Sequence, residues 1–528
     1  MNRSDPSVLP PGWSETTLGK AFNWASGGTP LRSREDFYGG EIPWAVIGDL
    51  NDGLVAETAS RITELGLKKS AAKWVEPGSV LVAMYGSIGK LGLPQMRLTT
   101  NQAIAFTDPA PVHPKYLFYY LMAQRAELIH RGKGGTQRNI SQTVLKAFPF
   151  VVAPLREQQL IVEAIETHFT RLDSAVETLQ RIQANLKRYR ASVLKAAVEG
   201  RLVATEAELA RRDYEPASVL LERILQERRL HWEEAELGKM TAKGKEPKND
   251  KWKTKYKEPV TPDTTILPEL AEEWCWATVS QLGDPTDQAV LTGPFGTTLG
   301  RADFVAEGVP VLTIGCLTDG GIRRDKAVYV TPSKAAELSR YGLRSGDVLF
   351  SRMATVGRAG LVGSEFDGGL FNYHLIRLRL QREAIDPRFF LAYVRGSEVV
   401  TDYVRSVNHG MTRDGINTAQ LLEMPVPLPN LPEQERIVAA VDEYTSQIDF
   451  LELGVIGAAQ RLQRLRQSIL KWAFEGKLVD QDANDEPATV LLQRIRADRE
   501  TKTPKKTTRK RRAKRMANSA EDEPALLT

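Results

Sequence analysis

The stretch of sequence that decides the fold occurs twice. Residues 155–203 read LREQQLIVEAIETHFTRLDSAVETLQRIQANLKRYRASVLKAAVEGRLV. Residues 431–479 read LPEQERIVAAVDEYTSQIDFLELGVIGAAQRLQRLRQSILKWAFEGKLV, align with the first copy without a gap, and share 18 of 49 residues with it. The segment Glu157–Glu199 contains no Pro or Gly, and a glycine closes each copy, at Gly200 and Gly476. This pattern predicts two copies of one long helix.

Apolar residues recur at every seventh position in both copies. In the first copy they are Ile165, Leu172, Leu179, Leu186 and Val193, with a second seam of His168, Ala175, Ile182, Tyr189 and Ala196. In the second copy they are Val441, Ile448, Val455, Leu462 and Ile469, with a second seam of Tyr444, Leu451, Ala458, Leu465 and Trp472. Five successive heptads predict a coiled coil rather than a helix inside an ordinary core. The simplest pairing joins the two helices of the chain antiparallel, although the connection between them is long enough for a parallel pair.

The regions beside the helices repeat as well. The matching segments are Ile42–Gly53 with Val309–Gly320, Val75–Leu93 with Leu343–Leu361, and EPASVLLERI at 215–224 with EPATVLLQRI at 486–495. Apolar runs bounded by Gly and Pro predict strands, and Pro near the start of an amphipathic run predicts a helix. The expected strands are Trp44–Ile47, Val80–Met84, Val311–Ile314 and Val348–Arg352, and the expected helices are Pro114–His130 and Pro387–Val404. These elements predict two duplicated mixed α/β domains beside the long helices.

The net charge of +5 is distributed unevenly along the chain. Residues 501–515 carry nine Lys or Arg and no acid, so the other residues sum to 5 − 9 = −4. Residues 238–258 hold eight Lys against three acids. Such segments are either solvated and disordered or attracted to phosphates, and charge alone does not decide between the two.

Several functional classes lack the residues that they require. Only two cysteines occur, Cys275 and Cys316, which excludes a disulfide scaffold and a Cys-based zinc site and fits a reducing compartment. No apolar run approaches the roughly 18 residues of a membrane span, and the first residues lack the apolar core of a signal peptide. The chain has no complete GxxxxGK phosphate loop, no GxSxG elbow and no Asn-Pro-Pro motif of an amino-methyltransferase, and its six His are scattered. No catalytic or metal site is therefore predicted.

Short motifs throughout the chain resemble one family. They are SGGTP at Ser26–Pro30, IPWAVIGDL at Ile42–Leu50, GGTQRNI at Gly134–Ile140, GPFG at Gly293–Gly296, the EQ pairs Glu157–Gln158 and Glu433–Gln434, and SVLKAAVEGRLV and SILKWAFEGKLV at Ser192–Val203 and Ser468–Val479. Over about residues 10–480 the sequence resembles the specificity subunit of type I restriction–modification systems. The duplicated EQ…LK…EGKLV helix is the specific part of this resemblance.

The resemblance implies a DNA reader that is not itself an enzyme. It implies two target-recognition domains, each reading one half of an asymmetric bipartite site in double-stranded DNA, and two helices that form an intramolecular antiparallel coiled coil and set the distance between half-sites. The implied domains are a first target-recognition domain at 1–153, a long helix at 154–200, a linker with a short helix and a Lys-rich segment at 201–262, a second target-recognition domain at 263–429, a second long helix at 430–476, and a tail at 477–528 with a short helix and a basic disordered segment.

The resemblance also implies partners. Two methyltransferase subunits would bind the helices and bring S-adenosylmethionine for adenine-N6 methylation. Where a nuclease is present, two restriction subunits would add ATP- and Mg-dependent cleavage. The chain itself is expected to bind no cofactor and no membrane and to act in a prokaryotic cytoplasm.

Candidate DNA contacts come from polar loop residues, since base readout needs side chains that reach groove edges and phosphates need any donor. In the loop before the first long helix they are Arg131, Lys133, Thr136, Gln137, Arg138 and Asn139, and in the second copy they are Asn408, Met411, Thr412 and Arg413. A second set follows the central strand of each domain: Tyr85, Ser87 and Lys90, and Arg352, Thr355 and Arg358.

Two other function classes remain open on the sequence. One is a tandem scaffold that binds RNA or protein, although RNA readers usually carry an aromatic stacking platform and none is evident. The other is an enzyme with an unfamiliar site, such as a methyltransferase fused to its reader, against which the missing Asn-Pro-Pro motif argues.

Overall fold

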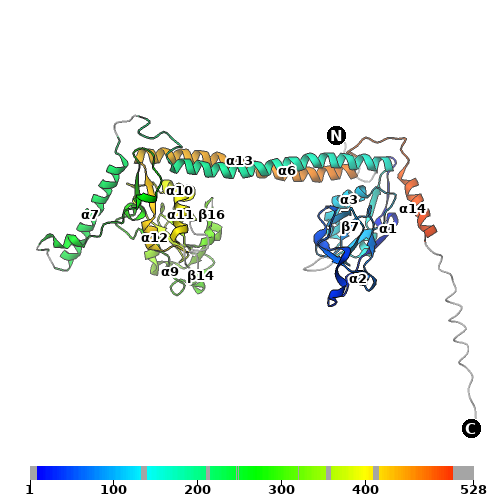
Figure 1. The fold of residues 1–528 in the computed structure, drawn as a ribbon, viewed down its shortest axis with the longest axis horizontal. Coiled ribbons are helices and arrows are strands. Elements are labelled where there is room, and N and C mark those ends of the chain that lie inside the picture. The colour runs from blue at the N-terminus through cyan, green and yellow to red at the C-terminus, as the bar shows by residue number, and fades with distance from the viewer. Residues whose placement is uncertain are drawn as a thin grey trace, which may run out of the picture. The chain divides into compact units, whose positions relative to one another are not determined.

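The protein divides into two compact units, each of which takes half of both long helices (Figure 1). Unit 1 comprises Met1–Leu179 and Gly457–Thr528, and unit 2 comprises Gln180–Ile456. The structure is a computed structural model, and it describes residues 9–132, 139–209, 214–244, 247, 249–318, 320–352, 358–407 and 415–502.

The two copies of the repeated stretch are helices of equal length. Helix α6 spans Leu155–Val198 and helix α13 spans Leu431–Phe474, 44 residues each. Helix α13 continues through two glycines, Gly454 and Gly457. The long helices predicted from the heptads are therefore confirmed.

The two helices pair antiparallel. In unit 1, Asp173 of α6 forms an ion pair with Arg466 of α13. In unit 2, Arg190 of α6 forms an ion pair with Asp449 of α13. Residue numbers thus fall along α13 as they rise along α6, which confirms the antiparallel arrangement and rules out the parallel one.

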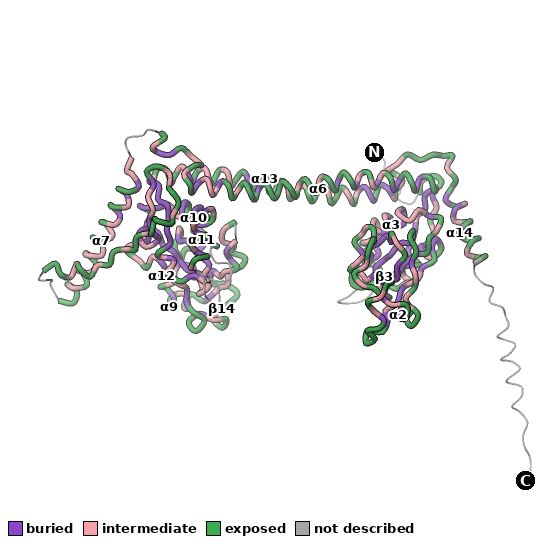
Figure 2. Tube along the Cα trace, viewed as in Figure 1, coloured by how far each residue is buried: buried purple, intermediate pink, exposed green. Residues whose placement is uncertain are grey.

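Only one of the two expected seams is buried. On the first seam Ile165, Leu172, Leu186, Val193, Ile448 and Ile469 are buried. On the second seam Ile182, Tyr189, Leu451, Leu465 and Trp472 are exposed, so the expectation of a second buried seam is wrong for these residues. Phe169, Ala197 and Ala473, each one position after an expected second-seam residue, are buried instead, as the drift of an α-helix from a strict seven-residue repeat allows. Figure 2 shows this as exposed residues all along α6 and α13, with burial concentrated in the globular parts.

The described residues of unit 1 form three small sheets. A two-stranded sheet pairs β1 (Ser14–Thr17) with β11 (Pro149–Val152). A five-stranded sheet has the order β2 (Trp24–Ser26), β10 (Ile104–Thr107), β7 (Leu81–Ala83), β8 (Leu91–Pro94), β4 (Gly53–Val55). A four-stranded sheet has the order β5 (Ser60–Ile62), β3 (Tyr38–Ala45), β9 (Leu98–Thr100), β6 (Trp74–Val75). The two larger sheets mix parallel and antiparallel pairs, and β3 pairs with β9 in parallel.

Unit 2 repeats the same strand neighbours. A two-stranded sheet pairs β12 (Cys275–Thr278) with β23 (Pro425–Leu428). A four-stranded sheet has the order β13 (Val290–Thr292), β22 (Leu375–Leu378), β19 (Val348–Ser351), β20 (Ala359–Leu361). Another has the order β14 (Phe304–Val305), β18 (Val328–Val330), β15 (Val309–Leu312), β21 (Leu370–Phe371), with the hairpin β16 (Leu317–Thr318) and β17 (Gly321–Ile322) beside it in the chain. The duplicated α/β fold predicted from the sequence is confirmed.

Further helices, most of them short, complete both units. In unit 1 they are α1 (Leu18–Ala21), α2 (Glu64–Lys68), α3 (Pro114–Ala123), α4 (Arg125–His130), α5 (Gln142–Lys146) and α14 (Ala488–Lys502). In unit 2 they are α7 (Ala217–Ala242), α8 (Val279–Leu282), α9 (Pro332–Glu337), α10 (Pro387–Gly396), α11 (Glu398–Val407) and α12 (Thr418–Glu423). Each expected amphipathic helix is thus split in two, at Gln124 and at Ser397, because the capped end of the first helix turns the chain there.

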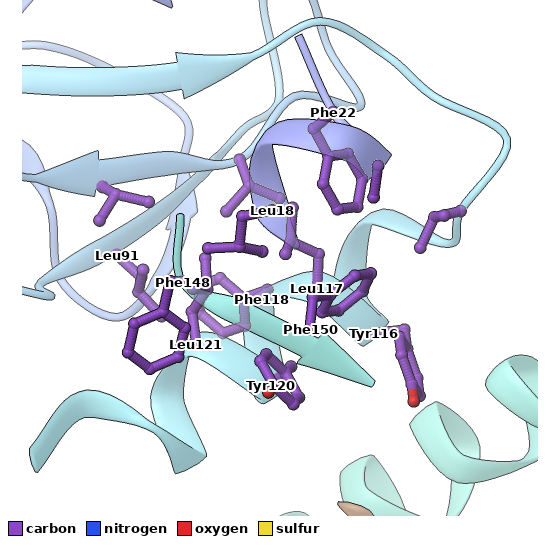
Figure 3. Packing of buried hydrophobic residues seen from close by; sticks show 14 of the residues in the cluster. Leu18, Phe22, Leu91, Tyr116, Leu117, Phe118, Tyr120, Leu121, Phe148 and Phe150 are labelled. Carbon is purple, nitrogen blue, oxygen red and sulfur yellow. The ribbon is translucent and has the colours of Figure 1, made fainter. Parts of the chain in front are cut away.

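The core of unit 1 combines elements from distant parts of the sequence. Figure 3 shows Tyr116 and Tyr120 of α3 against Phe150 of β11, with ring centroids 6.1 and 5.0 Å from the Phe150 ring. Phe474, at the end of α13, packs edge-on against both tyrosines. Helix α14 adds the buried side chains of Leu491 and Ile495 to the same cluster. The N-terminal domain is therefore closed by the C-terminal part of the chain.

The core of unit 2 is built in the same way. The end of α6 contributes Ala197 and Val198, and α7 contributes Leu220 and Ile224, to a cluster with the strands of the second domain. The repeated EPASVLLERI and EPATVLLQRI segments therefore have the same role: each begins a helix that seals the core of the unit in which its preceding long helix ends.

The described part of the Lys-rich segment is folded against α7. Trp232 of α7 stacks on Trp252, with ring centroids 6.0 Å apart and ring planes 23° apart. Lys253 forms an ion pair with Glu233 at 2.9 Å. A 3₁₀ helix at Asp250–Lys255 carries both Trp252 and Lys253. Solvated disorder is therefore wrong for this part of residues 238–258.

Candidate nucleic-acid interface

Loops of unit 1 converge where strand β7 ends. The backbone N–H of Met84 donates to the carbonyl of Ala103 at 2.8 Å. The N–H of Ile140 donates to the carbonyl of Met84 at 2.9 Å, and Tyr85 forms an isolated antiparallel bridge with Asn139. Three segments that are far apart in the sequence thus share one edge of the domain.

A glycine loop joins the same edge. Gly27 N–H donates to the carbonyl of Ile104 at 3.4 Å, and Gly28 N–H donates to that of Thr100 at 3.0 Å. A Cβ atom on Gly27 would lie 1.8 Å from the Thr100 oxygen, which no side chain tolerates. The conformation therefore requires glycine here. We call residues 27–30, 84–90, 101–103 and 139–140 rim 1.

Unit 2 forms the equivalent edge with the same hydrogen bonds. Arg352 N–H donates to the carbonyl of His374 at 3.1 Å, and Ile416 N–H donates to that of Arg352 at 3.0 Å. Gly293 N–H donates to the carbonyl of Leu375 at 3.2 Å, and a Cβ on Gly293 would lie 2.3 Å from the oxygen of Asn372. We call residues 293–296, 352, 358, 372–374 and 415–416 rim 2.

An ion pair supports the loop after β7. Arg125 of α4 contacts both carboxylate oxygens of Asp52, at 2.9 and 2.6 Å, and its Nε donates to the carbonyl of Gly89 at 2.9 Å. Asp52 holds a left-handed φ of 57° and its carboxylate accepts from the N–H of Leu91. These bonds fix the base of a loop whose tip, at Tyr85 and Ser87, is exposed.

The structure brings part of the predicted contact set together on rim 1. Tyr85, Ser87 and Asn139 are exposed there. Arg131 lies in the adjacent turn, exposed, with an ion pair to Glu127 at 2.8 Å and its guanidinium 4.8 Å from the ring centroid of Phe148. The other predicted residues of this loop, Lys133, Thr136, Gln137 and Arg138, lie outside the described residues.

In rim 2 the structure describes Arg352 and Arg358. Arg352 is half-buried, and within the described part of the chain its Nε is buried without a hydrogen-bond partner. Arg358 is exposed and its Nη1 donates to the carbonyl of Leu317 at 3.4 Å. The remaining predicted residues, Thr355, Asn408, Met411, Thr412 and Arg413, lie outside the described residues.

Lys90 and Arg358 occupy equivalent positions. The carbonyl of each accepts from the central strand, from Ala83 N–H in unit 1 and from Ser351 N–H in unit 2. Lys90 Nζ is 3.5 Å from the carbonyl of Ile47, which begins the 3₁₀ helix Ile47–Asp49, and Arg358 Nη1 donates to the carbonyl of Leu317 in β16. Lys90 and Arg358 thus each make a hydrogen bond that serves the fold.

Sequence reasoning missed five residues of the two rims. They are Thr29 and Gln102 in rim 1 and Phe295, Tyr373 and His374 in rim 2. The available signals were the SGGTP and GPFG motifs, and the Asn-Gln and Asn-Tyr pairs that follow a buried strand in each copy. Only the backbone bonds show that these segments meet the loop after the central strand.

The described residues offer neither a metal cluster nor a membrane-spanning helix. Across the described ranges, no group of three or more His, Cys, Asp or Glu side chains is arranged to hold a metal ion. Among the helices that the structure describes, none combines the length and the apolar character needed to cross a membrane.

Comparison with known proteins identifies the family. The profile of the type I restriction modification DNA specificity domain matches residues 10–187 and 301–456, which is more than half of the chain. The chain belongs to this family. It is a DNA specificity subunit of a type I restriction–modification system, and the resemblance seen in the sequence is confirmed.

Curated relatives of this specificity subunit align over most of its length. It is 23% identical to the EcoDI specificity subunit of Escherichia coli over 513 residues, which cover 95% of this chain and 99% of that one. It is 23% identical to the EcoBI specificity subunit of Escherichia coli, covering 83% of each chain. It is 25% identical to the StySPI specificity subunit of Salmonella potsdam, and the alignment covers 97% of this chain and 100% of that one.

A solved structure shares the fold of this specificity subunit. The structure is described as the basis of complex assembly and conformational transition of the type I R-M system. It superposes with a TM-score of 0.62 at 16% identity, covering 89% of this chain and all of the other. This similarity supports the duplicated fold and the pair of long helices.

Proposed function

We propose that each unit of this specificity subunit reads one half of an asymmetric, bipartite site in double-stranded DNA, through rim 1 and rim 2. The observation that carries the proposal is that both rims have one backbone frame but different side chains. The bond from Met84 N–H to Ala103 and the bond from Arg352 N–H to His374 are equivalent. A common frame presents two surfaces to DNA in the same way, and different side chains on it select different bases.

The proposed contacts include the residues predicted from the sequence. Tyr85, Ser87, Lys90, Arg131 and Asn139 supply hydroxyl, ammonium, guanidinium and amide groups to rim 1 and its border. Arg352 and Arg358 supply guanidinium groups to rim 2. Guanidinium and amide groups are suited to guanine and adenine edges, and all of these donors can bind phosphate.

The long helices are proposed to bind two methyltransferase subunits, one on each unit. In unit 2, Phe450 and Leu453 of α13 are 76% and 69% exposed, and Ile456 is exposed on the same helix. In unit 1, Leu465 and Trp472 are exposed. Large apolar side chains clustered on a helix surface favour a protein partner, because their contact with water is unfavourable.

The chemistry of the assembled complex is proposed to reside in the partners. The methyltransferase subunits would bind S-adenosylmethionine and methylate adenine at N6, and two restriction subunits, where present, would use ATP and Mg²⁺ to cleave DNA. The chain itself would contribute recognition and assembly in the cytoplasm. Support comes from the relatives, which are named as specificity subunits of type I restriction enzymes.

Exchange of one domain tests the proposal. Residues 263–429 are replaced by the corresponding domain of another specificity subunit, and the methylated sequences are mapped in cells that carry the partner methyltransferase. We expect one half of the recognised sequence to change and the other to persist. A change in both halves would contradict separate reading by the two units. Methyl transfer by the purified chain alone would contradict a role without catalysis.

A further inference from the structure

The two rims differ at one pair of equivalent positions. In rim 1 the hydroxyl of Thr29 hydrogen-bonds to the side-chain oxygen of Gln102. In rim 2 the corresponding pair is Phe295 and Tyr373, whose rings stack with centroids 5.9 Å apart and planes 25° apart. The equivalence is fixed by the preceding asparagine: Asn101 Oδ1 accepts from Ala103 N–H at 3.1 Å, as Asn372 Oδ1 accepts from His374 N–H at 3.2 Å.

The aromatic pair continues into a short ladder. The Tyr373 ring lies 3.9 Å from the ring of His374, centroid to centroid, with the planes 36° apart. The carbonyl of His374 accepts from the N–H of Arg352, a residue already proposed to contact DNA. The ladder of ring contacts thus runs from His374 through Tyr373 to Phe295, and the backbone of His374 is hydrogen-bonded to the backbone of Arg352.

Phe295 is the exposed end of this ladder. Its side chain is 58% exposed, whereas Tyr373 and His374 are half-buried. Its backbone carbonyl accepts from the N–H groups of Thr298 at 2.8 Å and Leu299 at 3.0 Å. The phenyl ring is therefore held outward by a hydrogen-bonded turn below it and a stacked ring beside it, and little conformational freedom remains to be lost on binding.

The chemistry of a phenyl ring restricts what it can read. A phenyl ring has no hydrogen-bonding group, so it cannot recognise the donors and acceptors of a base edge. The apolar feature of the major groove is the C5-methyl group of thymine, and Phe is among the side chains that contact it. Each methyl group transferred from water to an apolar contact is favourable by roughly 0.8 kcal/mol.

We propose that Phe295 contacts a thymine methyl group in the major groove of the half-site read by unit 2, and that Tyr373 acts as a positioning residue for its ring. The inference rests on the proposed function, since it requires that rim 2 faces DNA. It assigns thymine selectivity to one half of the site only, because rim 1 carries the polar pair Thr29 and Gln102 at this position.

The test replaces thymine by deoxyuridine, which pairs identically and lacks the methyl group. The full chain, purified with its methyltransferase partner, first selects its site from a pool of random duplexes. The half read by unit 2 is assigned by exchange of residues 263–429. Each thymine of that half is then replaced in turn, and the dissociation constant is measured. We expect about a fourfold loss of affinity at one thymine, the factor that corresponds to about 0.8 kcal/mol.

Variants of Phe295 connect the effect to this side chain. Phe295→Ala should bind the thymine and deoxyuridine duplexes equally, at the affinity of the unmodified chain for deoxyuridine. Phe295→Leu, which keeps an apolar group, should retain part of the preference for thymine. Ile266→Ala removes an 84% exposed apolar side chain of the same unit outside rim 2, and it should leave the preference intact.

The opposite results overturn the inference. One such result is a half-site that contains no thymine. Another is an affinity that does not fall when deoxyuridine replaces any thymine of that half. A third is the same loss of affinity on this replacement in the unmodified chain and in Phe295→Ala. Weaker association of Phe295→Ala with the methyltransferase, with unchanged discrimination between the duplexes, would make Phe295 a protein contact and also overturn it. A complex that selects no sequence at all would instead overturn the proposed function, on which the inference depends.

Discussion

The indole N–H of Trp13 donates a hydrogen bond to Oε2 of Glu157 at 2.9 Å, and this contact ties the N-terminal strand region to the first turn of the long helix α6. Both side chains are buried, and Glu157 is 2% exposed. Within the described residues the second carboxylate oxygen of Glu157, Oε1, is buried and has no hydrogen-bond partner.

The second copy repeats this contact. Trp274 donates to Oε1 of Glu433 at 2.9 Å. The glutamine that follows each Glu is buried as well: Gln158 accepts from His113 N–H at 2.9 Å, and Gln434 accepts from Asp386 N–H at 2.8 Å. The EQ pair therefore has a structural role, since it fixes the start of each long helix to two separate parts of its domain.

The stability of the fold should depend on pH through these two carboxyl groups. Burial raises the pKa of both Glu157 and Glu433, against the opposing effect of the Trp hydrogen bonds. A carboxyl group with a raised folded pKa contributes stability that is complete below its unfolded pKa, about 4.3. That contribution is lost as the pH rises through the folded pKa.

The expected readout is the free energy of unfolding of the chain minus that of the double variant Glu157→Gln, Glu433→Gln. Gln keeps an acceptor for the indole N–H and does not titrate. The difference, measured by urea unfolding, should decrease as the pH rises above about 4.3, the unfolded pKa of Glu. Glu435→Gln, which alters an exposed Glu on the same helix as Glu433, is the control and should show no such decrease. A difference that increases with pH would contradict the assignment.

Removal of the indole donor should destabilise the corresponding unit. Trp13→Phe keeps most of the apolar ring but leaves Glu157 without its donor, which costs about 1–3 kcal/mol for a buried acceptor. Chemical denaturation followed by circular dichroism measures the loss. Trp276→Phe is the matched control, because its N–H reaches the carbonyl of Pro268 at 3.3 Å in an exposed setting. Equal effects of the two variants would show that the buried carboxylate is not responsible.

A buried ionic network holds the second domain together. Arg379, which directly follows strand β22, contacts both carboxylate oxygens of buried Asp347 at 2.8 and 2.7 Å. It also forms an ion pair with Asp287. Arg379→Met should destabilise unit 2 by about 3–5 kcal/mol, because it leaves Asp347 charged and without its partner in the interior.

The controls for this prediction separate burial from charge. Arg323→Met breaks an exposed ion pair with Asp325 in the same unit, and its effect on stability should be much smaller than that of Arg379→Met. The double variant Arg379→Met, Asp347→Leu should recover much of the lost stability, because it removes both buried charges. Hydrogen exchange resolved by peptide should assign the change to the strands next to Asp347 and Arg379, which are β19 and β22. A loss in the double variant as large as in Arg379→Met would contradict the explanation.

Helix α14 should be required for the stability of unit 1, although it is separated from that domain by more than 300 residues. A chain that ends at Asp485 lacks the buried side chains of Leu491 and Ile495 and the bonds from Arg499 to Asn23. Full burial of a Leu or Ile side chain is worth about 1.5–3 kcal/mol, so we expect faster hydrogen exchange in α1 and α3. A chain that ends at Lys502 retains every one of these contacts and should behave as the full chain does. Unchanged protection after the longer truncation would contradict this role.

The exposed apolar residues of α13 should decide binding of the methyltransferase in unit 2. Replacement of both Phe450 and Leu453 by Ser should weaken the association at least tenfold, because each side chain would lose an apolar contact worth about 1.5–3 kcal/mol. Sedimentation velocity of the mixed subunits measures it. The unfolding midpoint of the chain should not fall, since both side chains already face solvent. Ile266→Ser is the control, and equal weakening by that variant would contradict a specific surface.

The sequence by itself determined the duplication, the two long helices and the family. A seven-residue apolar period and a 49-residue gapless repeat are local patterns, and local patterns are sufficient to specify a helix and the face that it buries. The first seam, with Leu172, Leu186 and Ile448, is buried as expected. The second seam failed at Tyr189 and Trp472, and Ala473, the residue after Trp472, is buried instead, because the drift of the helix from a strict seven-residue repeat changes which residues face the interior.

Only the tertiary structure decided which segments meet. Phe474 and Ile495 close the core of the N-terminal domain. Gln102 becomes part of rim 1 through Thr29, and Tyr373 becomes part of rim 2 through Phe295. All of these contacts link residues that are distant in the chain. Such contacts depend on strand pairing and on close approaches at glycines such as Gly27 and Gly293, where backbone atoms occupy the place of a side chain. No composition, period or motif specifies these approaches, since they arise from the packing of whole elements against one another.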